Sequence, residues 1–354
     1  MIRKLVTIQK IIDLKPIENA DAIECASVLG WHVVVKKGEF KVGDSCVYFE
    51  IDSLLPTVSE FDFLSKSGVK KSYTDGKEYE GYRLKTIRLR GQISQGLCLP
   101  ISILKGKKYP SDSRKNPVYK LGADVTSLLG VVKYEPVVPA NLTGQAKELF
   151  PSFIPKTDET RIQFAPKVLE RHAGKVFYVT EKVDGASCTI FIKDGELNCC
   201  SRNLNLLDDP TNTFWKVAKE ISLLEKIKKV NENIALQGEL VGDNVQGNKL
   251  KINGQKILFF NAYNFKEGRH LNFSEFISLC RELEIPTVPI ISKKYILPKT
   301  VDELVKFATR KSLLSPETWV EGIVIRSLEE DWDEELGRLS FKVINPEFLL
   351  AFGD

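Results

Sequence analysis

Short apolar runs alternate with polar turns through the first 105 residues of the chain. Runs such as AIECASVLG, WHVVVKK and DSCVYFEI have the length and the β-branched content of strands. Gly30, Gly38 and the Gly43-Asp44 pair lie between them, and such residues favour tight turns. A further strand is expected in GYRLKTIRLR, ahead of GQISQGLCLP. Many short strands at this spacing predict a small β-barrel in residues 1–105, and an OB-like fold is the leading interpretation.

Polar and proline-rich stretches interrupt this pattern twice. KSGVKKSYTDGKEYEG, which lies between two of the strands, is expected to form a loop. Residues 106–160 predict a linker or a wrap-around segment instead of a domain core, because they are rich in lysine and proline. The prolines are Pro110, Pro117, Pro136, Pro139, Pro151 and Pro155.

Residues 161–354 mix strands with helices and predict an α+β domain. VFYVT is expected to be a strand, and CTIFI and ELNCCSR to form a hairpin around the Asp194-Gly195 turn. Apolar residues recur at helical spacing over 212–230. Further helices are expected at 273–283 and at 301–310, the latter with Thr300 and Glu303 as a capping box. The strands NIALQGEL, KILFFNAYNF, VEGIVIRS and GRLSFKVI and a short helix, PEFLLAF, complete the domain.

The composition is that of a globular protein of two or three domains. The chain has 354 residues, of which 43% are hydrophobic and 28% charged. Its net charge of +4 permits a nucleic-acid partner. No apolar stretch is long enough to span a membrane, and the N-terminus lacks the pattern of a signal peptide. We therefore expect no membrane association.

The seven cysteines include no C-x-x-C pair. This pattern favours reduced thiols in the cytoplasm or another reducing compartment. The three histidines are isolated in the sequence, which argues against a zinc site.

Candidate chemistry begins at Glu181-Lys182-Val183-Asp184-Gly185, a K-x-D-G string at the end of an expected strand. A lysine amine can attack the α-phosphorus of a nucleoside triphosphate and hold the nucleotide as a phosphoramidate. Alone, such a string is more often a solvated hairpin corner. Its meaning therefore depends on the residues that follow it in the chain.

Five downstream segments strengthen the interpretation, and their order resembles that of the covalent nucleotidyltransferase superfamily. This superfamily comprises DNA ligases, RNA ligases and mRNA-capping enzymes. The segments correspond to its motifs Ia, III, IIIa, IV and V and cover, with Lys182 itself, about 182–343. They are Ser201-Arg202-Asn203, Gln237-Gly238-Glu239, Phe259-Phe260-Asn261-Ala262-Tyr263, Glu321-Gly322-Ile323-Val324-Ile325-Arg326 and Phe341-Lys342.

The residue types suit nucleotidyl transfer. A lysine nucleophile must lose its proton, although its ordinary pKa is about 10.4. We expect Arg202, Lys342, a metal and partial burial to lower the pKa of Lys182. Asp184 (also a candidate catalytic residue), Glu239 and Glu321 carry hard oxygen ligands for Mg²⁺ (or Mn²⁺), either directly or through water. Such an ion would offset the charge of the phosphates.

The remaining nucleotide contacts follow partly from side-chain chemistry and partly from the resemblance. Arg202 and Lys342 are suited to the α-phosphate, and Lys342 is therefore also a candidate catalytic residue. Phe260 is the first choice for a ring stacked on adenine, with Phe259 as the alternative. The resemblance places Glu181 at the adenine edge and Glu239 near the ribose.

The position of the extra domain narrows the resemblance. DNA ligases and capping enzymes carry an OB domain after motif V, whereas few residues follow Lys342 here. An N-terminal OB-like domain ahead of a minimal ligase domain resembles the RNA ligases typified by the Naegleria and Deinococcus enzymes. Residues 20–55 are similar to the N-terminal domain of that family. Residues 157–163 are similar to its entry into the catalytic domain, which makes Arg161 a candidate nucleotide contact.

The resemblance implies a nucleotidyltransferase domain (ATP-grasp-like) of antiparallel sheets with flanking helices, preceded by an OB-like barrel. It also implies an ATP-dependent RNA ligase that repairs RNA through lysyl-AMP. The expected partner is a nicked duplex or a broken strand with 3′-OH and 5′-phosphate ends, and the enzyme is expected to act as a monomer. A GTP-using capping enzyme, a DNA-sealing enzyme and a non-catalytic RNA-binding protein with a relic ligase fold remain alternatives.

One departure from the family pattern supports the relic alternative. RNA ligases of this kind carry K-x-K in motif V, but Ser340 occupies the first position here. Loss of this cation is expected to weaken the binding of the α-phosphate or pyrophosphate, unless Lys249 or Lys251 substitutes for it.

A basic stretch is the candidate RNA contact. Arg83, Lys85, Arg88 and Arg90 are proposed to track RNA phosphates along the OB-like domain. A solvated charged face is the equal alternative. The stretch contains one acid, Asp112, and continues with Lys105, Lys107, Lys108, Arg114, Lys115 and Lys120.

Overall fold

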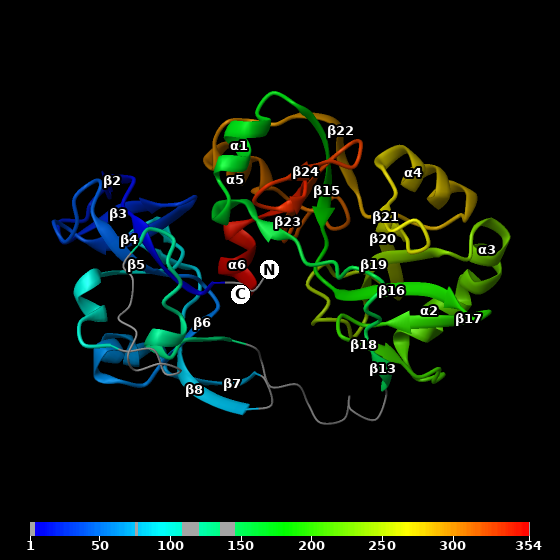
Figure 1. Cartoon of the computed structure of the whole chain (residues 1–354), viewed down its shortest axis with the longest axis horizontal. Coiled ribbons are helices and arrows are strands. Elements are labelled where there is room, and N and C mark those ends of the chain that lie inside the picture. Colours follow the sequence, from blue (N-terminus) through cyan, green and yellow to red (C-terminus); the bar gives the residue numbers. More distant parts are fainter. Residues whose placement is uncertain (1–3, 75–76, 108–119, 135–145, 354) are drawn as a thin grey trace. The chain divides into compact units, whose positions relative to one another are not determined.

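A computed structural model describes residues 4–74, 77–107, 120–134 and 146–353 of the chain (Figure 1). It divides into two compact units. Unit 1 comprises Met1–Pro139 and Leu349–Asp354, and unit 2 comprises Ala140–Phe348. The finer division at residues 105 and 160 stays a prediction, and Pro110, Pro117, Pro136 and Pro139 lie outside the described residues.

Unit 1 consists of short antiparallel strands, as the turn spacing predicted. Its strands form sheets in the orders β1-β5-β11, β2-β3-β4, β10-β9 and β12-β6-β8-β7. The strand bounds are β1 (Val6–Lys10), β2 (Asp13–Pro16), β3 (Ile23–Val28), β4 (Trp31–Lys36), β5 (Ser45–Phe49), β6 (Ser53–Pro56), β7 (Val69–Thr74), β8 (Lys77–Arg83), β9 (Ile87–Leu89), β10 (Gln92–Ser94), β11 (Leu97–Pro100) and β12 (Val132–Lys133). Three 3-10 helices, η1 (Ser59–Ser67), η2 (Ile101–Leu104) and η3 (Ser127–Leu129), complete its described elements.

The polar stretch expected to be a loop instead contains two paired antiparallel strands, β7 and the start of β8. Lys71 on β7 reaches two acids on β8, with Nζ 2.8 Å from Glu78 and 3.2 Å from Glu80. Opposite charges that face one another across antiparallel strands stabilise such a pairing. The prediction was wrong because it weighed polarity alone, without these cross-strand pairs.

Unit 2 contains a seven-stranded sheet in the order β13-β18-β17-β16-β19-β20-β21. Apolar residues from this sheet and from three helices form one core, which packs the helices against one face of the sheet. The strand bounds are β13 (Ala146–Leu149), β16 (Ala186–Lys193), β17 (Glu196–Cys200), β18 (Leu204–Leu206), β19 (Ile234–Gly242), β20 (Gln255–Asn264) and β21 (Arg269–His270). The helices are α2 (Thr213–Glu220), α3 (Leu223–Val230) and α4 (Phe273–Glu282).

The single helix predicted over 212–230 is broken into α2 and α3. Ser222, at the break, has a left-handed backbone with φ 51°, a conformation that interrupts a right-handed helix. The apolar spacing continues across the break, which is why periodicity did not reveal it.

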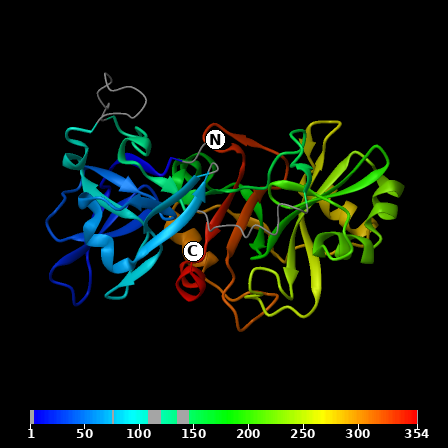
Figure 2. The same ribbon diagram turned by 90° about the horizontal axis from the view of Figure 1, so that it is seen from below.

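The second sheet of unit 2 brings together strands that are far apart in the sequence. Its order is β14-β26-β23-β15-β22, and the orange-to-red strands β23 and β26 lie side by side in Figure 2. Helices α1 (Lys167–His172) and α5 (Val301–Ala308) pack on its apolar face. The strand bounds are β14 (Thr160–Arg161), β15 (Val176–Lys182), β22 (Ile290–Ile296), β23 (Gly322–Ser327) and β26 (Ser340–Ile344), and a small hairpin of β24 (Trp332–Asp333) and β25 (Gly337–Arg338) connects β23 to β26.

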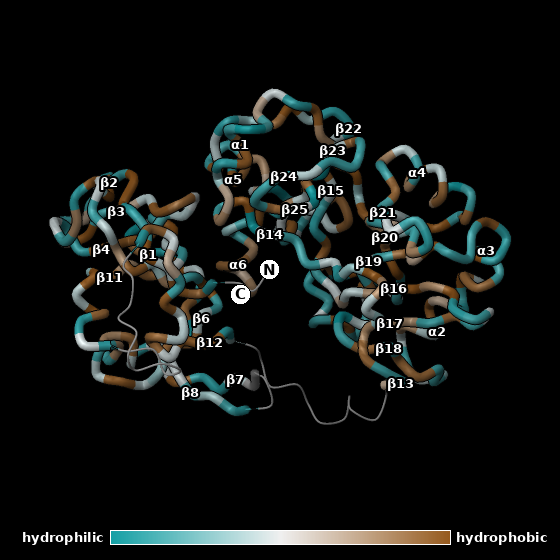
Figure 3. Tube along the Cα trace, viewed as in Figure 1, coloured by the Kyte–Doolittle hydropathy of each residue, from teal (hydrophilic) through white to brown (hydrophobic). Residues whose placement is uncertain are grey.

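One turn and one helix start lie where the sequence predicted them. The Asp194-Gly195 turn has positive φ at both residues, which suits a two-residue hairpin between β16 and β17. The Thr300 side chain accepts a hydrogen bond from the Glu303 N–H at the start of α5. Figure 3 shows hydrophobic and hydrophilic stretches alternating along the elements of both units. The remaining elements are η5 (Ile162–Phe164) and α6 (Pro346–Phe352).

All seven cysteines lie among the described residues, and all are buried without forming a disulfide. In the part of the chain that the structure describes, no helix has the length and hydrophobicity needed to cross a membrane.

Candidate active site

The last residue of β15, Lys182, faces a carboxylate across the sheet. Lys182 pairs in register with Gly322, the first residue of β23, so Glu321 lies directly beside it. Its Nζ donates to both oxygens of Glu321 at 2.5 Å. The side chains are 26% and 16% exposed. A charge-assisted pair of this kind fixes the amine in one position.

The turn that follows Lys182 is seated on β19 and is not a solvated corner. A Cβ on Gly185 would lie 2.3 Å from the Leu240 carbonyl oxygen and 2.8 Å from Val241 Cγ1. Glycine is therefore required by the close approach of two backbones. The Gly185 N–H donates to Glu239 on β19, which ties the turn to a second carboxylate.

Three carboxylates act on one another around the amine. Burial, together with the charges of Glu321 and Asp184, raises the pKa of Glu239 to about 8, against the opposing effect of Lys182. Burial and Glu321 also raise the pKa of Asp184, although Lys249 and Lys182 oppose this. Since like charges resist joint ionisation, the group has a high affinity for cations.

The pKa of Lys182 lies in the opposite direction from the one expected. Burial would lower it, but Glu321 and Glu239 outweigh burial, and Asp184 adds to their effect, so the pKa of Lys182 is raised. The protein's own carboxylates thus hold this lysine as an ammonium. For the amine to act as a nucleophile, these carboxylates must interact with another cation instead of with Lys182.

Lys342 is the cation whose pKa is lowered. It lies on β26, where the parallel strand β14 pairs Arg161 with it. Burial, Lys182 and Arg161 lower the pKa of Lys342 to about 7, while Glu321 and Asp158 oppose them. The structure therefore gathers Lys182, Lys342 and Arg161 around one small region, which suits an anionic ligand.

Arg202 lies at the exposed side of this region. Its Nη2 is 2.7 Å from Asp158 Oδ1, and both side chains are 56% exposed. Asp158 also acts on the pKa of Lys342, which places the pair on that side of the site. An ion pair so exposed contributes little stability and opens readily to another anion.

Glu181 and Phe260 lie beside a small apolar cluster. Glu181 is 2% exposed and accepts hydrogen bonds from Ser312 Oγ at 2.9 Å and from the Leu313 N–H. Phe260 is half-buried and packs with Leu314 in a cluster that also contains Val183, Val241, Leu250, Ile252, Leu258 and Val288. Phe259 is wholly buried in the core under the helices, so Phe260 is the ring open to a ligand.

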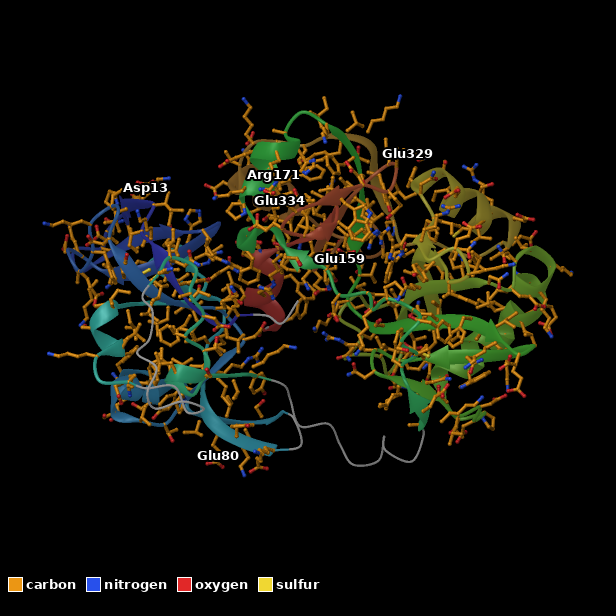
Figure 4. All side chains as sticks on the ribbon, viewed as in Figure 1. Asp13, Glu80, Glu159, Arg171, Glu329 and Glu334 are labelled. Carbon is orange, nitrogen blue, oxygen red and sulfur yellow. The ribbon has the colours of Figure 1, made fainter. Side chains whose placement is uncertain are left out.

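Ser340 has a defined partner on the neighbouring strand. The register of β23 and β26 pairs Ser340 with Arg326, and Arg326 Nε donates to Ser340 Oγ at 3.1 Å. Arg326 is 3% exposed and forms an ion pair of 2.9 Å with Glu159, which is labelled in Figure 4. A cation therefore stands directly across from the position where the family pattern has a lysine.

Comparisons with known proteins agree with this geometry. The sequence matches an OB-fold domain model over residues 5–101 and an RNA ligase model over residues 175–344. The structure is similar to that of Naegleria gruberi RNA ligase with PPi, at a TM-score of 0.84 and 37% identity over 99% of both chains. The chain belongs to the RNA ligase family.

Other structures of the same relative contain nucleotides. A lysine-to-alanine variant with ATP and Mn gives a TM-score of 0.84 at 37% identity, covering 98% of this RNA ligase and 99% of the relative. A glutamate-to-alanine variant with AMP and Mn gives 0.84 at 37% identity over 99% of both chains. A comparison with curated proteins found no match. The predicted α+β ligase domain and the N-terminal OB fold are confirmed.

The carboxylates of this RNA ligase fit a hydrated divalent ion. Asp184 Oδ2 is buried and 3.1 Å from Lys249 Nζ, but the geometry of that contact is not that of a hydrogen bond. Among the described residues, no three His, Cys, Asp or Glu side chains converge to cage an ion by themselves. Asp184, Glu239 and Glu321 supply hard oxygen atoms, which suit a divalent ion that keeps part of its water shell.

Lys249 is the site residue that the sequence identified least well. Its Nζ donates to Asp184 Oδ1 at 3.3 Å and lies 5.2 Å from the centre of the Phe348 ring. It belongs to the loop between β19 and β20, outside any motif, so it was only one of two possible substitutes for the missing lysine. Lys251, the other, is exposed and has a left-handed backbone.

The predicted RNA contacts of unit 1 do not form one equivalent set. Lys85, Arg88 and Arg90 are exposed. Arg83 instead forms an ion pair of 3.2 Å with Asp52, and its guanidinium lies 4.2 Å from the centre of the Tyr134 ring. Arg83 is therefore already engaged within the unit. Of the further basic residues in the stretch, Lys108, Arg114 and Lys115 lie outside the described residues.

Replacing Glu321 by Gln is expected to lower the pKa of Lys182, because a charged hydrogen-bond partner is lost. The pH at which Lys182 becomes reactive towards an amine-acylating reagent, followed by peptide mass spectrometry, measures this change. Exposed Lys299 serves as the internal control, since its reactivity midpoint should stay fixed. An unmoved midpoint for Lys182 would show that Glu239 and Asp184 hold the proton without Glu321.

Replacing Ser340 by Lys is expected to destabilise this RNA ligase, although it restores the family pattern. The longer side chain must fit beside the buried Arg326 guanidinium, and this should cost about 1–3 kcal/mol of unfolding free energy. Ser340→Ala, the control, should lose only about 1 kcal/mol with the hydrogen bond. Urea unfolding measures both values. A Ser340→Lys enzyme of wild-type stability and higher ligation rate would contradict this account.

Proposed function

We propose that this ATP-dependent RNA ligase seals RNA 3′-OH and 5′-phosphate ends through AMP bound covalently to Lys182. The observation that carries the proposal is the Lys182 amine held 2.5 Å from Glu321, among further carboxylates and beside Lys342. An amine so placed can lose its proton once the carboxylates around it bind a divalent cation. In repair, the substrate is a nicked duplex or a broken strand with these ends.

In the first step the Lys182 Nζ attacks the α-phosphorus of ATP. The N–P bond forms, the bond from the α-phosphorus to the bridging oxygen breaks, and pyrophosphate leaves. Glu321 is within hydrogen-bond distance of the amine and is therefore placed to accept its proton. Lys342, Arg161 and Arg202 bind the phosphates; for Arg202 this means leaving Asp158.

The base and ribose of ATP occupy the apolar side of the site. Phe260 provides a half-buried ring for stacking, Glu181 lies at the adenine edge, and Glu239 lies near the ribose. Asp184, Glu239 and Glu321 would hold Mg²⁺ or Mn²⁺ mainly through water. When bound, the ion supplies positive charge that offsets the charge developing on the phosphates.

The later steps use the same cations on RNA. AMP passes from Lys182 to the RNA 5′-phosphate, and the N–P bond breaks as the new P–O bond forms. An RNA 3′-OH then attacks that 5′-phosphorus, which seals the strand and releases AMP. Because all three steps are phosphoryl transfers, one set of positioned charges can serve each of them.

Incubation with Mg²⁺ and ATP labelled at the α-phosphate is expected to leave label on the denatured protein. Lys182→Met should abolish this label, because it removes the amine that contacts Glu321. Lys299→Met, an exposed lysine away from the site, is the matched control and should label normally. GTP run in parallel tests the nucleotide.

Two results would contradict the proposal. Label retained on the Lys182→Met protein would place the nucleotide elsewhere. Labelling by GTP in preference to ATP would favour a capping reaction. Enzyme preparations should first be shown to be free of bound AMP, because pre-adenylated protein would not take up label.

Charge reversal at Arg88 and Arg90 is expected to weaken RNA binding in unit 1. Loss of two phosphate contacts should lower the slope of log affinity against log salt by about 1.4. Fluorescence anisotropy with a single-stranded RNA at several salt concentrations measures the slope. Lys36→Glu with Lys37→Glu, a second exposed basic pair in the same unit, is the control. An equal effect of the control pair would show that RNA binding depends on net charge and not on Arg88 and Arg90 in particular.

A further inference from the structure

Residues 149–158 cross the face of the seven-stranded sheet that lies opposite the helices. Gln237 Nε2 on β19 donates to the Pro155 carbonyl oxygen at 2.8 Å. Thr157 Oγ1 lies 3.0 Å from Ser187 Oγ on β16. Ile154 packs with Phe191, Cys200 and Ala235 in a core cluster separate from the one under the helices. The segment is thus fastened to the sheet along its length.

This face of the sheet also carries the active site. Side chains alternate between the two faces of a strand, so Glu239 on β19 shares its face with Gln237 and Ala235. On β16, Ser187 and Phe191 share that face as well, four residues or about 13 Å apart. The segment therefore runs from the active-site end of the sheet to the surface near Phe191. A few nucleotides of RNA span this distance.

At its far end the segment presents aromatic rings at the surface. Phe153 is 39% exposed and meets Phe191 edge-on, with ring centres 5.7 Å apart at 88°. Phe265 also supports it, at 5.5 Å and 67°, and packs in turn against Phe191. The Phe153 ring is held in place by its neighbours and remains accessible, as a stacking platform requires.

Cations accompany these rings. Lys193 Nζ lies 5.6 Å from the centre of the Phe153 ring, and Lys156 Nζ lies 6.0 Å from that of Phe150. Lys156 donates to the neutral Asn203 side chain at 2.8 Å. Neither lysine forms an ion pair with any residue in the described part of the chain, whereas the nearby acids Asp158 and Glu196 are paired with Arg202 and Lys147.

We propose that Phe150, Phe153, Lys156 and Lys193 form a docking strip for single-stranded RNA that leads to Lys182. The strip combines an aromatic platform with unpaired cations, the combination used to hold bases and phosphates of single strands. It reaches the active site through Asn203 and Arg202, the exposed cation paired with Asp158. This inference rests on the proposed function, because it assumes that the reacting strand is RNA.

The strip suits the single-stranded part of an RNA substrate because of its construction. Stacking on Phe153 needs a base with an open face, which a paired and stacked duplex does not offer along its length. Lys193 provides charge beside the Phe153 ring, and Lys156 provides it beside the Phe150 ring. A protein partner would instead require a wider apolar surface than one interrupted by lysines.

The test uses the full-length enzyme and a 5′-phosphorylated 12-nucleotide RNA with a 3′ fluorophore. Phe153→Leu keeps an apolar side chain but removes the ring, and it should weaken binding at least about fivefold. Phe153→Tyr restores a ring and should restore binding. Lys193→Gln should lower the slope of log affinity against log salt by about 0.7. Lys228→Gln, on α3 at the opposite face, is the matched control.

Self-adenylation by labelled ATP is measured on each preparation, because this step needs no RNA. Weaker binding by Phe153→Leu, rescue by Phe153→Tyr and an unaffected control would support the strip. Wild-type affinity in Phe153→Leu would overturn it, and so would an equal loss in Phe153→Tyr. Failure of the wild-type enzyme to become adenylated would instead overturn the proposed function, so that the two failures are distinguishable.

Discussion

The contact between Lys182 and Glu321 is the constraint on which the rest of the active site depends. It joins the ends of two neighbouring strands, β15 and β23, at the point where each leaves the sheet. Because both side chains are mostly withdrawn from water, neither can be displaced without leaving a charge poorly solvated. The position of the amine is therefore set by the register of a sheet and not by a loop.

That register in turn requires backbones to approach closely on both sides of the pair. A Cβ on Gly322 would lie 2.3 Å from the Val343 carbonyl oxygen on β26, and Gly185 meets β19 in the same way. The two glycines of the motifs thus have a structural reason that is separate from catalysis. They let four strands from distant parts of the sequence bring their polar residues within one small volume.

The sequence predicted most of the strands and several of the charged residues that the structure brings together around Lys182, because the motifs lie at or near strand ends. It did not predict the direction in which the pKa of Lys182 moves, since that depends on how near Glu321 lies relative to the cations. Lys249 and Ser312 were missed or left open because they come from loops whose paths no local pattern defines. Arg83 could not be separated from Arg88 without knowing that Asp52 lies next to it.

The lysine on β26 has a consequence for how the pocket meets its ligands. A group with a pKa of about 7 is only partly charged at neutral pH, whereas a phosphate placed against it favours the charged form. Occupation of the pocket by phosphate thus draws a proton from solution, and departure of the anion returns it. The ligase would then exchange protons with the surrounding buffer at each arrival and release, and its hold on phosphate would weaken as the medium becomes more alkaline.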